Sequence, residues 1–242
     1  MRFIPWFFYF WLYLFTMIPK HRKAVALRES GQFEEHDKLV QSAVRPWAKK
    51  MIASAGGQVQ VEGLENMPKE PAVYVVNHLS FCDIPVLLGY LGDDTKPLVA
   101  KENISHFPII RGWMKELHCV FLHRDEPRQA IKDLDEAIKW VKEGYSMVIF
   151  PEGTRSYTGE VGEFKSGAFR IAQKSKVPVV PVCLKGTNDV MHRGSLWMHK
   201  APVTLKVLPA IDTSGYSRSD WRALPAIAEN QIREALKEIK SR

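Results

Sequence analysis

The sequence is poor in cysteine and lacks the serine motif of common hydrolases. Its three cysteines, Cys82, Cys119 and Cys183, are far apart and include no Cys-x-x-Cys pair. This pattern argues against a disulfide framework and favours small buried side chains in a reducing compartment. No Gly-x-Ser-x-Gly string marks a nucleophile elbow. Repeats and low-complexity tracts are absent too, which argues against a solenoid or a long disordered chain.

Length and composition are those of a folded domain. A chain of 242 residues can form one sizeable α/β domain with an appendage. Lys and Arg outnumber Asp and Glu by 34 to 27, which gives a net charge of +7. A basic surface suits nucleic acid, a phosphorylated substrate or an anionic membrane, and net charge does not distinguish these three partners.

The first residues are unusually apolar and aromatic. Residues 3–18 form an almost unbroken apolar run that ends in Pro19 and the basic stretch 20–23. No small-residue cleavage site follows, so a signal peptide is a poor fit. The run is shorter than the roughly 20 residues of a spanning helix, and its aromatic side chains are typical of the bilayer interface. We therefore expect an anchor that enters one leaflet; a true span and a buried core helix are the alternatives.

A second helix is predicted over residues 39–52. Apolar side chains repeat there at helical spacing, and Lys38, Arg45 and Lys49 cluster on the other side. Pro46 is expected to kink this helix and Gly56 to end it. Its apolar side has three candidate partners, which are the catalytic body, the first helix and lipid.

From residue 58 onwards, short β-branched runs alternate with helical stretches. Strands are predicted at residues 58–61, 72–76, 97–100, 119–123, 147–150, 177–184 and 203–208, and helices at 131–141, 164–175 and 225–239. The alternation predicts an α/β fold with a mostly parallel central sheet covered by helices on both faces. We expect residues 1–55 to form an N-terminal two-helix membrane-associating motif and residues 56–242 the catalytic domain. Ligand sites in such folds lie at the carboxyl ends of strands.

His78 and Asp83 follow the apolar run 72–76 directly. Five residues within one helix would place them about 140° apart, so they can meet only if His78 precedes the helix. Ser80 and Asp83 also fit a capping box, which is the purely structural interpretation and which places His78 in the loop. From there Asp83 can orient one ring nitrogen and leave the other as a base. Because no enzyme nucleophile stands out, a substrate hydroxyl is the expected attacker.

A second string, Phe150-Pro151-Glu152-Gly153-Thr154-Arg155-Ser156, follows another predicted strand. Gly153 lets the backbone approach a ligand closely, and the Arg155 guanidinium matches the geometry of phosphate. The structural alternative is a surface turn with an ion pair between Glu152 and Arg155.

Together these strings resemble a known family. Asn77-His78-x-x-x-x-Asp83 and the string 150–156 are similar to the first and third blocks of the glycerolipid acyltransferases, most closely the lysophosphatidate acyltransferases. The second block resembles Phe121-Leu122-His123-Arg124, preceded by Lys101 and by residues 107–113, where Arg111 departs from the family's usual apolar residue. Residues 177–182 resemble the fourth block. The matches keep the family's order over residues 72–187.

The resemblance implies transfer of a fatty acyl group from a thioester to the sn-2 hydroxyl of lysophosphatidate. It makes His78 the general base and Asp83 its partner, with no covalent acyl-enzyme. The residues implied in substrate binding are Glu152, Gly153, Thr154, Arg155, Lys101 and Arg124. No metal and no cofactor are expected, and the co-substrate is acyl-CoA or an acyl carrier protein thioester. The family also implies a bacterial-type protein attached to the cytoplasmic face of the cell membrane.

Two alternatives stay open at this stage. A relative could use glycerol 3-phosphate or another lysophospholipid as acceptor, or the chain could be a non-catalytic protein that binds membrane lipid. No nucleic-acid partner is expected, because basic-aromatic recognition motifs are absent and residues 1–18 do not suit that role.

Overall fold

The computed structural model describes residues 3–156, 158–192, 194–195 and 197–240. Strands occur in all seven predicted places. They are β1 (Gly57–Glu62), β2 (Val73–Val76), β3 (Val99–Lys101), β4 (Val120–Leu122), β5 (Met147–Ile149), β6 (Val179–Lys185) and β7 (Ala201–Val207). The apolar, β-branched composition of β2, β5 and β6 suits strands that are buried on both sides.

The strands form one main sheet and one small one. The main sheet has the order β1-β7-β6-β2-β5, and β3 pairs with β4 separately. Within the main sheet only the β6–β7 pair is antiparallel, so the prediction of a mostly parallel sheet is confirmed. The separation of β3 and β4 was not predicted, because a three-residue apolar run carries no information about its neighbours.

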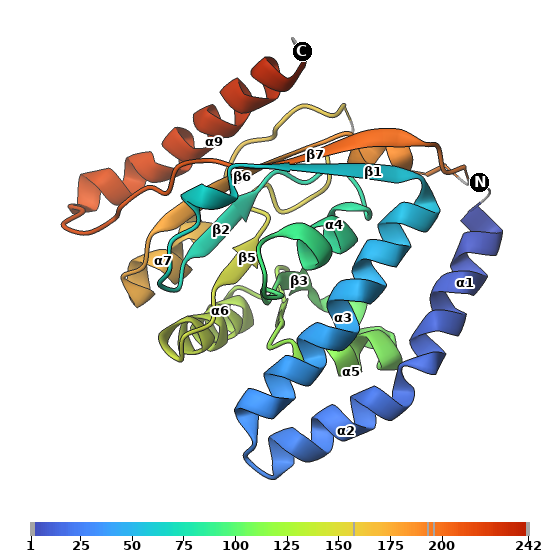
Figure 1. Cartoon of the computed structure of the whole chain (residues 1–242). Helices are drawn as coiled ribbons and strands as arrows, with labels where there is room; N and C mark the ends of the chain where they lie inside the picture. The colour runs from blue at the N-terminus through green and yellow to red at the C-terminus, as the bar shows by residue number, and fades with distance from the viewer. Residues whose placement is uncertain (1–2, 157, 193, 196, 241–242) are drawn as a thin grey trace.

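Helices cover both faces of the main sheet, as predicted (Figure 1). Successive residues of β2 show this, since Tyr74 and Val76 pack into one core cluster while Val73 and Val75 pack into another. The first cluster includes buried residues of α3 (Phe33–Ala55) and α4 (Asp83–Tyr90). The second includes residues of α6 (Pro127–Lys142), α7 (Arg170–Ser175) and α9 (Arg218–Lys240). Two more α-helices of the described chain after β1 are α5 (Pro108–Glu116) and the short α8 (Thr187–Val190).

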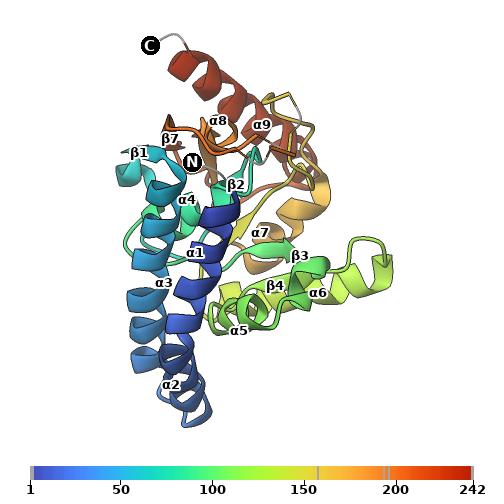
Figure 2. The same cartoon turned by 90° about the vertical axis from the view of Figure 1, so that its right-hand side faces the viewer.

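The N-terminal region contains three helices, so the prediction of two was wrong. Between α1 (Phe3–Thr16) and α3 lies α2 (Ile18–Glu29), in which Ala24 is the buried residue. Pro19 stands in its first turn, where a missing N–H costs nothing. The helix escaped prediction because it lacks an apolar stripe. Figures 1 and 2 both show α1 lying alongside α3, with α2 joining them at one end.

The apolar side of α3 packs on the protein body and not on lipid. Val40, Val44 and Ile52 are among its buried residues and belong to the same cluster as the sheet. The basic side of α3 also contacts the protein body. The Arg45 guanidinium donates hydrogen bonds to the carbonyls of Gly89, Gly92 and Asp93 at the end of α4. The helix continues through Pro46 to the left-handed Gly56, which ends it as predicted.

Helix α1 has one side against the body and one side exposed. Leu14 is buried, and the Trp6 indole N–H donates to the Met51 carbonyl of α3. Ile4, Phe7, Phe8, Leu12 and Phe15 are exposed on the other side. Within the part of the chain that the structure describes, no helix is both long and apolar enough to cross a membrane. The division of the chain at residue 55 stays a prediction.

Candidate active site

The loop between β2 and α4 brings His78 and Asp83 together. The His78 Nδ1 atom lies 2.6 Å from Oδ2 of Asp83. His78 precedes the helix and Asp83 is its first residue, so the geometry predicted for this pair is observed. The Asp83 side chain is fully buried, while the His78 side chain keeps 18% of its surface exposed. A rigid carboxylate therefore holds an imidazole that remains accessible.

Asp83 also fixes the loop that carries His78. Its Oδ2 accepts hydrogen bonds from the backbone N–H groups of Leu79 and Ser80, at 2.7 and 3.0 Å. Its Oδ1 accepts one from the Thr187 hydroxyl. The expectation that Ser80 caps the helix was wrong, because the residue before α4 is Cys82. The Ser80 hydroxyl instead accepts from the Cys82 N–H and donates to the Met191 carbonyl.

The imidazole is held by further contacts on its other sides. Its ring stacks on Phe150, the first residue of the second motif, with centroids 4.0 Å apart. With Nδ1 committed to the carboxylate, the Nδ1–H tautomer leaves Nε2 as the proton acceptor. This arrangement can remove a proton from a hydroxyl group placed next to the ring.

Glu152 joins the two motifs. Its Oε1 accepts from the backbone N–H of His78 at 2.7 Å, and its Oε2 accepts from that of Gly162 at 2.8 Å. The Ser156 N–H in turn donates to the His78 carbonyl. Burial raises the pKa of Glu152, and the two backbone hydrogen bonds oppose this shift. The structure thus shows Glu152 as a link between the loops, and its predicted contact with substrate stays a prediction.

Basic side chains gather around the loop 152–156. The Arg155 guanidinium lies over the Phe81 ring at 3.7 Å, which places this charge beside the His78 loop. The Arg124 guanidinium, just beyond β4, donates to the Gly153 carbonyl. Gly153 has a φ of +74°, and a Cβ atom there would lie 3.2 Å from Nζ of Lys165.

The predicted substrate-binding residues are not equally close to one another. Arg124, Glu152, Gly153 and Arg155 belong to one contact network with His78, and Thr154 lies between the last two in the same loop. Lys101 ends β3 beside Leu122 of β4 and is exposed. In the described part of the chain it makes no hydrogen bond or ion pair with that network.

Sequence reasoning missed four residues at this site. They are Thr187, Phe150 as a stacking partner, Phe81 as the surface under Arg155, and Lys165. Thr187 comes from the start of α8, 104 residues after Asp83, and nothing in the chain relates the two before folding. Phe81 and Phe150 lie inside the two motifs, so their positions in the sequence could have identified them as part of the site. Cys82 is excluded as a nucleophile, because burial raises its pKa to about 12.

Comparisons with known proteins point to one family. A family model described as Acyltransferase matches residues 58–185. A chloroplastic 1-acyl-sn-glycerol-3-phosphate acyltransferase of Brassica napus is 46% identical over 141 residues, or 57% of this chain. The chain spans only about 40% of the length of that relative. A 1-acyl-sn-glycerol-3-phosphate acyltransferase of Borreliella burgdorferi is 31% identical over 198 residues, which cover 81% of this chain and 79% of the relative.

A solved structure is similar over the whole chain. The crystal structure of the 1-acyl-sn-glycerophosphate (LPA) acyltransferase PlsC from Thermotoga maritima has a TM-score of 0.79 and 30% sequence identity. The similarity covers 100% of this chain and 99% of that one. The matched family region contains both His78 and Arg155. The chain belongs to the acyltransferase family.

Proposed function

We propose that this protein transfers a fatty acyl group from a thioester to the sn-2 hydroxyl of 1-acyl-glycerol-3-phosphate, which gives phosphatidate. The observation that carries the proposal is the contact of His78 Nδ1 with the buried Asp83 carboxylate, beside a loop bearing Arg155. The names of the relatives from Brassica napus, Borreliella burgdorferi and Thermotoga maritima support the same substrate.

The reaction needs no covalent enzyme intermediate. Nε2 of His78 accepts the proton of the acceptor hydroxyl as its oxygen attacks the thioester carbonyl. The tetrahedral intermediate collapses, the C–S bond breaks, and the thiolate leaves with the proton returned by the imidazolium. Asp83 holds the ring and stabilises its charge during this step. The inert Cys82 supports direct attack by the substrate, because it leaves no activated thiol beside the ring.

The acceptor's phosphate is proposed to bind at the basic loop. Arg155 offers a planar guanidinium whose paired N–H groups match two phosphate oxygens, and its stacking on Phe81 limits its motion. Arg124 and Lys165 add positive charge beside Gly153. Lys101 is proposed to join them on the same side once substrate is bound. The acyl donor is proposed to be acyl-CoA or an acyl carrier protein thioester, as a co-substrate and not a resident cofactor.

The exposed face of α1 is proposed to contact the membrane surface that supplies the substrate. Five large apolar residues are exposed there, and Phe107 extends the patch because its ring lies 6.3 Å from that of Trp11. Aromatic residues favour the interface between headgroups and acyl chains. The protein would lie on the cytoplasmic face of the cell membrane with α1 partly inserted.

Replacing His78 by Ala should abolish turnover without releasing the protein from membranes. Loss of a general base lowers the rate by roughly 10²–10⁴-fold. The measurement is phosphatidate formation from lysophosphatidate with each thioester donor, together with vesicle cosedimentation. His106→Ala is the matched control, because His106 is exposed and its ring contacts Asn103 and Glu102 of its own helical turn. Full activity in His78→Ala would refute the mechanism, and no turnover by the wild type with either donor would favour a non-catalytic lipid-binding protein.

Replacing Arg155 by Ala should weaken the recognition of acceptor phosphate selectively. A hydrogen bond to a charged group is worth about 1.5–3 kcal/mol, so KM for lysophosphatidate should rise roughly 10- to 150-fold. Steady-state kinetics with monoacylglycerol, which lacks the phosphate, should be nearly unchanged, and Arg155→Lys should recover only part of the loss. Equal losses with both acceptors would contradict this role. Faster wild-type turnover of glycerol 3-phosphate than of lysophosphatidate would contradict the proposed acceptor.

Replacing Phe8 and Leu12 by Ser should reduce membrane binding. These side chains are 68% and 65% exposed, so the fold loses little when they change. Removing their burial in lipid should weaken partitioning to anionic vesicles at least tenfold, because each contributes about 1.5–3 kcal/mol when fully buried. Leu64→Ser with Ile131→Ser is the matched control, since these residues are exposed on other elements. Equal partitioning of both double variants in cosedimentation would exclude α1 as the anchor.

A further inference from the structure

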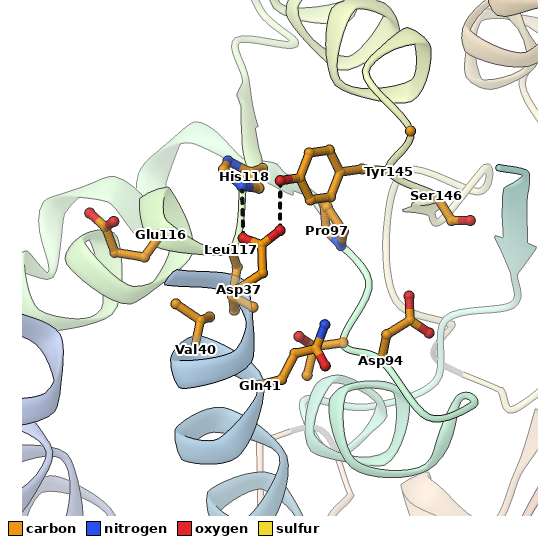
Figure 3. A pocket seen from close by; sticks show the side chains of 12 residues that line it. Asp37, Val40, Gln41, Asp94, Pro97, Glu116, Leu117, His118, Tyr145 and Ser146 are labelled. Carbon is orange, nitrogen blue, oxygen red and sulfur yellow. Dashed lines mark hydrogen bonds and ion pairs between the residues drawn. The ribbon is translucent and has the colours of Figure 1, made fainter. Parts of the chain in front are cut away.

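A second cluster of ionisable side chains lies away from the His78 loop. His36 and Asp37 belong to the first turns of α3, and His118 lies between α5 and β4. Figure 3 shows Asp37 and His118 facing each other. Tyr145 follows α6 and lines the same cavity of about 230 Å³. Within the part of the chain that the structure describes, no hydrogen bond, ion pair or ring contact joins these four residues to Asp83, Phe150, Glu152 or Phe81. The proposed acyl transfer therefore does not explain this cluster.

Three potential ligand atoms converge in the cluster. One donor atom from each of His36, Asp37 and His118 lies within 4.8 Å of the other two. Oδ1 of Asp37 is 2.8 Å from Nδ1 of His36 and 3.7 Å from Nε2 of His118. Ligand atoms about 2.0–2.2 Å from a tetrahedral metal ion are separated by roughly 3.5 Å. The observed separations therefore need only small side-chain shifts.

His118 is held in this position at a cost. The residue is 6% exposed, and its Nε2 atom has no hydrogen-bond partner in the described part of the chain. Its ion-pair contact with Asp37, at 3.7 Å, is too long for a hydrogen bond, and a buried polar group without a hydrogen bond costs about 1–3 kcal/mol. Its backbone is also left-handed, with a φ of +57°, which is uncommon for a residue with a side chain. Trp140 and Tyr145 pack against the His118 ring, with ring centroids 4.1 and 4.4 Å away, and hold it facing Asp37.

The surrounding hydrogen bonds match those of an outer ligand shell. Nε2 of His36, the nitrogen turned away from Asp37, lies 3.0 Å from the Glu116 carboxylate, which also accepts from Arg28. The Tyr145 hydroxyl donates to the other oxygen of Asp37 at 2.8 Å. Histidines that bind metals characteristically donate their second N–H to a carboxylate, and ligating carboxylates are themselves hydrogen-bonded.

The charges also suit a cation. Burial raises the pKa of Asp37, but contacts with His118, Tyr145 and His36 outweigh this effect and leave the pKa below its ordinary value. The carboxylate is therefore ionised at neutral pH. Both ring nitrogens of His36 face carboxylate oxygens, with Nδ1 2.8 Å from Asp37 and Nε2 3.0 Å from Glu116.

We propose that His36, Asp37 and His118 bind one divalent transition-metal ion, of which Zn²⁺ is the best match. Two imidazoles and a carboxylate suit zinc and its neighbours better than calcium or magnesium, which prefer oxygen ligands alone. Asp37 and His118 also line the cavity. The ion would join the start of α3 to the segment between α5 and β4, and so fasten the N-terminal helices to the body.

Titration of chelator-treated full-length protein with Zn²⁺ tests this site. Isothermal calorimetry should give one ion per chain, and Tm should rise by roughly 5–10 °C at a hundredfold excess over Kd. The Co²⁺-loaded protein should show visible absorption typical of four- or five-coordinate nitrogen and oxygen ligation. Asp37→Asn and His118→Asn should each weaken binding at least 100-fold; Asn suits the left-handed backbone at position 118. Glu116→Gln, which changes only the outer shell, should weaken it about 10- to 100-fold.

His199→Ala provides the control, because His192 and His199 form another histidine pair, with ring centroids 6.5 Å apart. This variant should bind Zn²⁺ as the wild type does. Circular dichroism of each metal-free variant separates loss of the site from loss of the fold, and Asp37→Asn repeats the test if His118→Asn does not fold. Millimolar binding, unchanged binding in both ligand variants, or loss in His199→Ala would overturn the proposal.

Discussion

The arrangement of the active site depends on one buried carboxylate. Asp83 is completely enclosed, and it accepts hydrogen bonds from the imidazole of His78, two backbone N–H groups and the hydroxyl of Thr187. A buried charge is stable only when such partners compensate its lost hydration. These partners can reach Asp83 only if the chain leaves β2, folds back over the start of α4, and meets the start of α8. The energetic requirement of one side chain thus fixes the conformation that exposes His78.

The second motif extends this constraint to the basic loop. Glu152 accepts from the backbone of His78, and Ser156 donates to it, so the loop after β5 cannot move independently of the loop after β2. Arg155 then lies over Phe81, within the segment that Asp83 organises. Backbone contacts therefore hold the base, His78, and the cationic side chain, Arg155, at a fixed separation. Catalysis of a two-substrate reaction requires such preorganisation.

Sequence reasoning predicted the parts that local geometry determines. The helical period alone required His78 to precede the helix that begins at Asp83, and the structure agrees. Strand positions followed from apolar runs, most clearly for β2, β5 and β6, whose residues are buried on both sides of the sheet. The role of Thr187 was not predictable, because only the folded chain brings it to Asp83. Helix α2 was missed for a different reason, as its sequence has no apolar stripe to mark it. The cluster around Asp37 joins residues about 80 positions apart, so no local sequence pattern predicts it.

The tautomer of His78 tests the central claim most directly. Nitrogen-15 chemical shifts of histidine-labelled protein, with the His78 signals assigned from their absence in a His78 variant, distinguish the two nitrogens of the neutral ring. If Asp83 orients the base as described, Nδ1 carries the proton and Nε2 is unprotonated. A neutral ring protonated at Nε2 would contradict the account, because the nitrogen that faces the substrate could not then accept a proton.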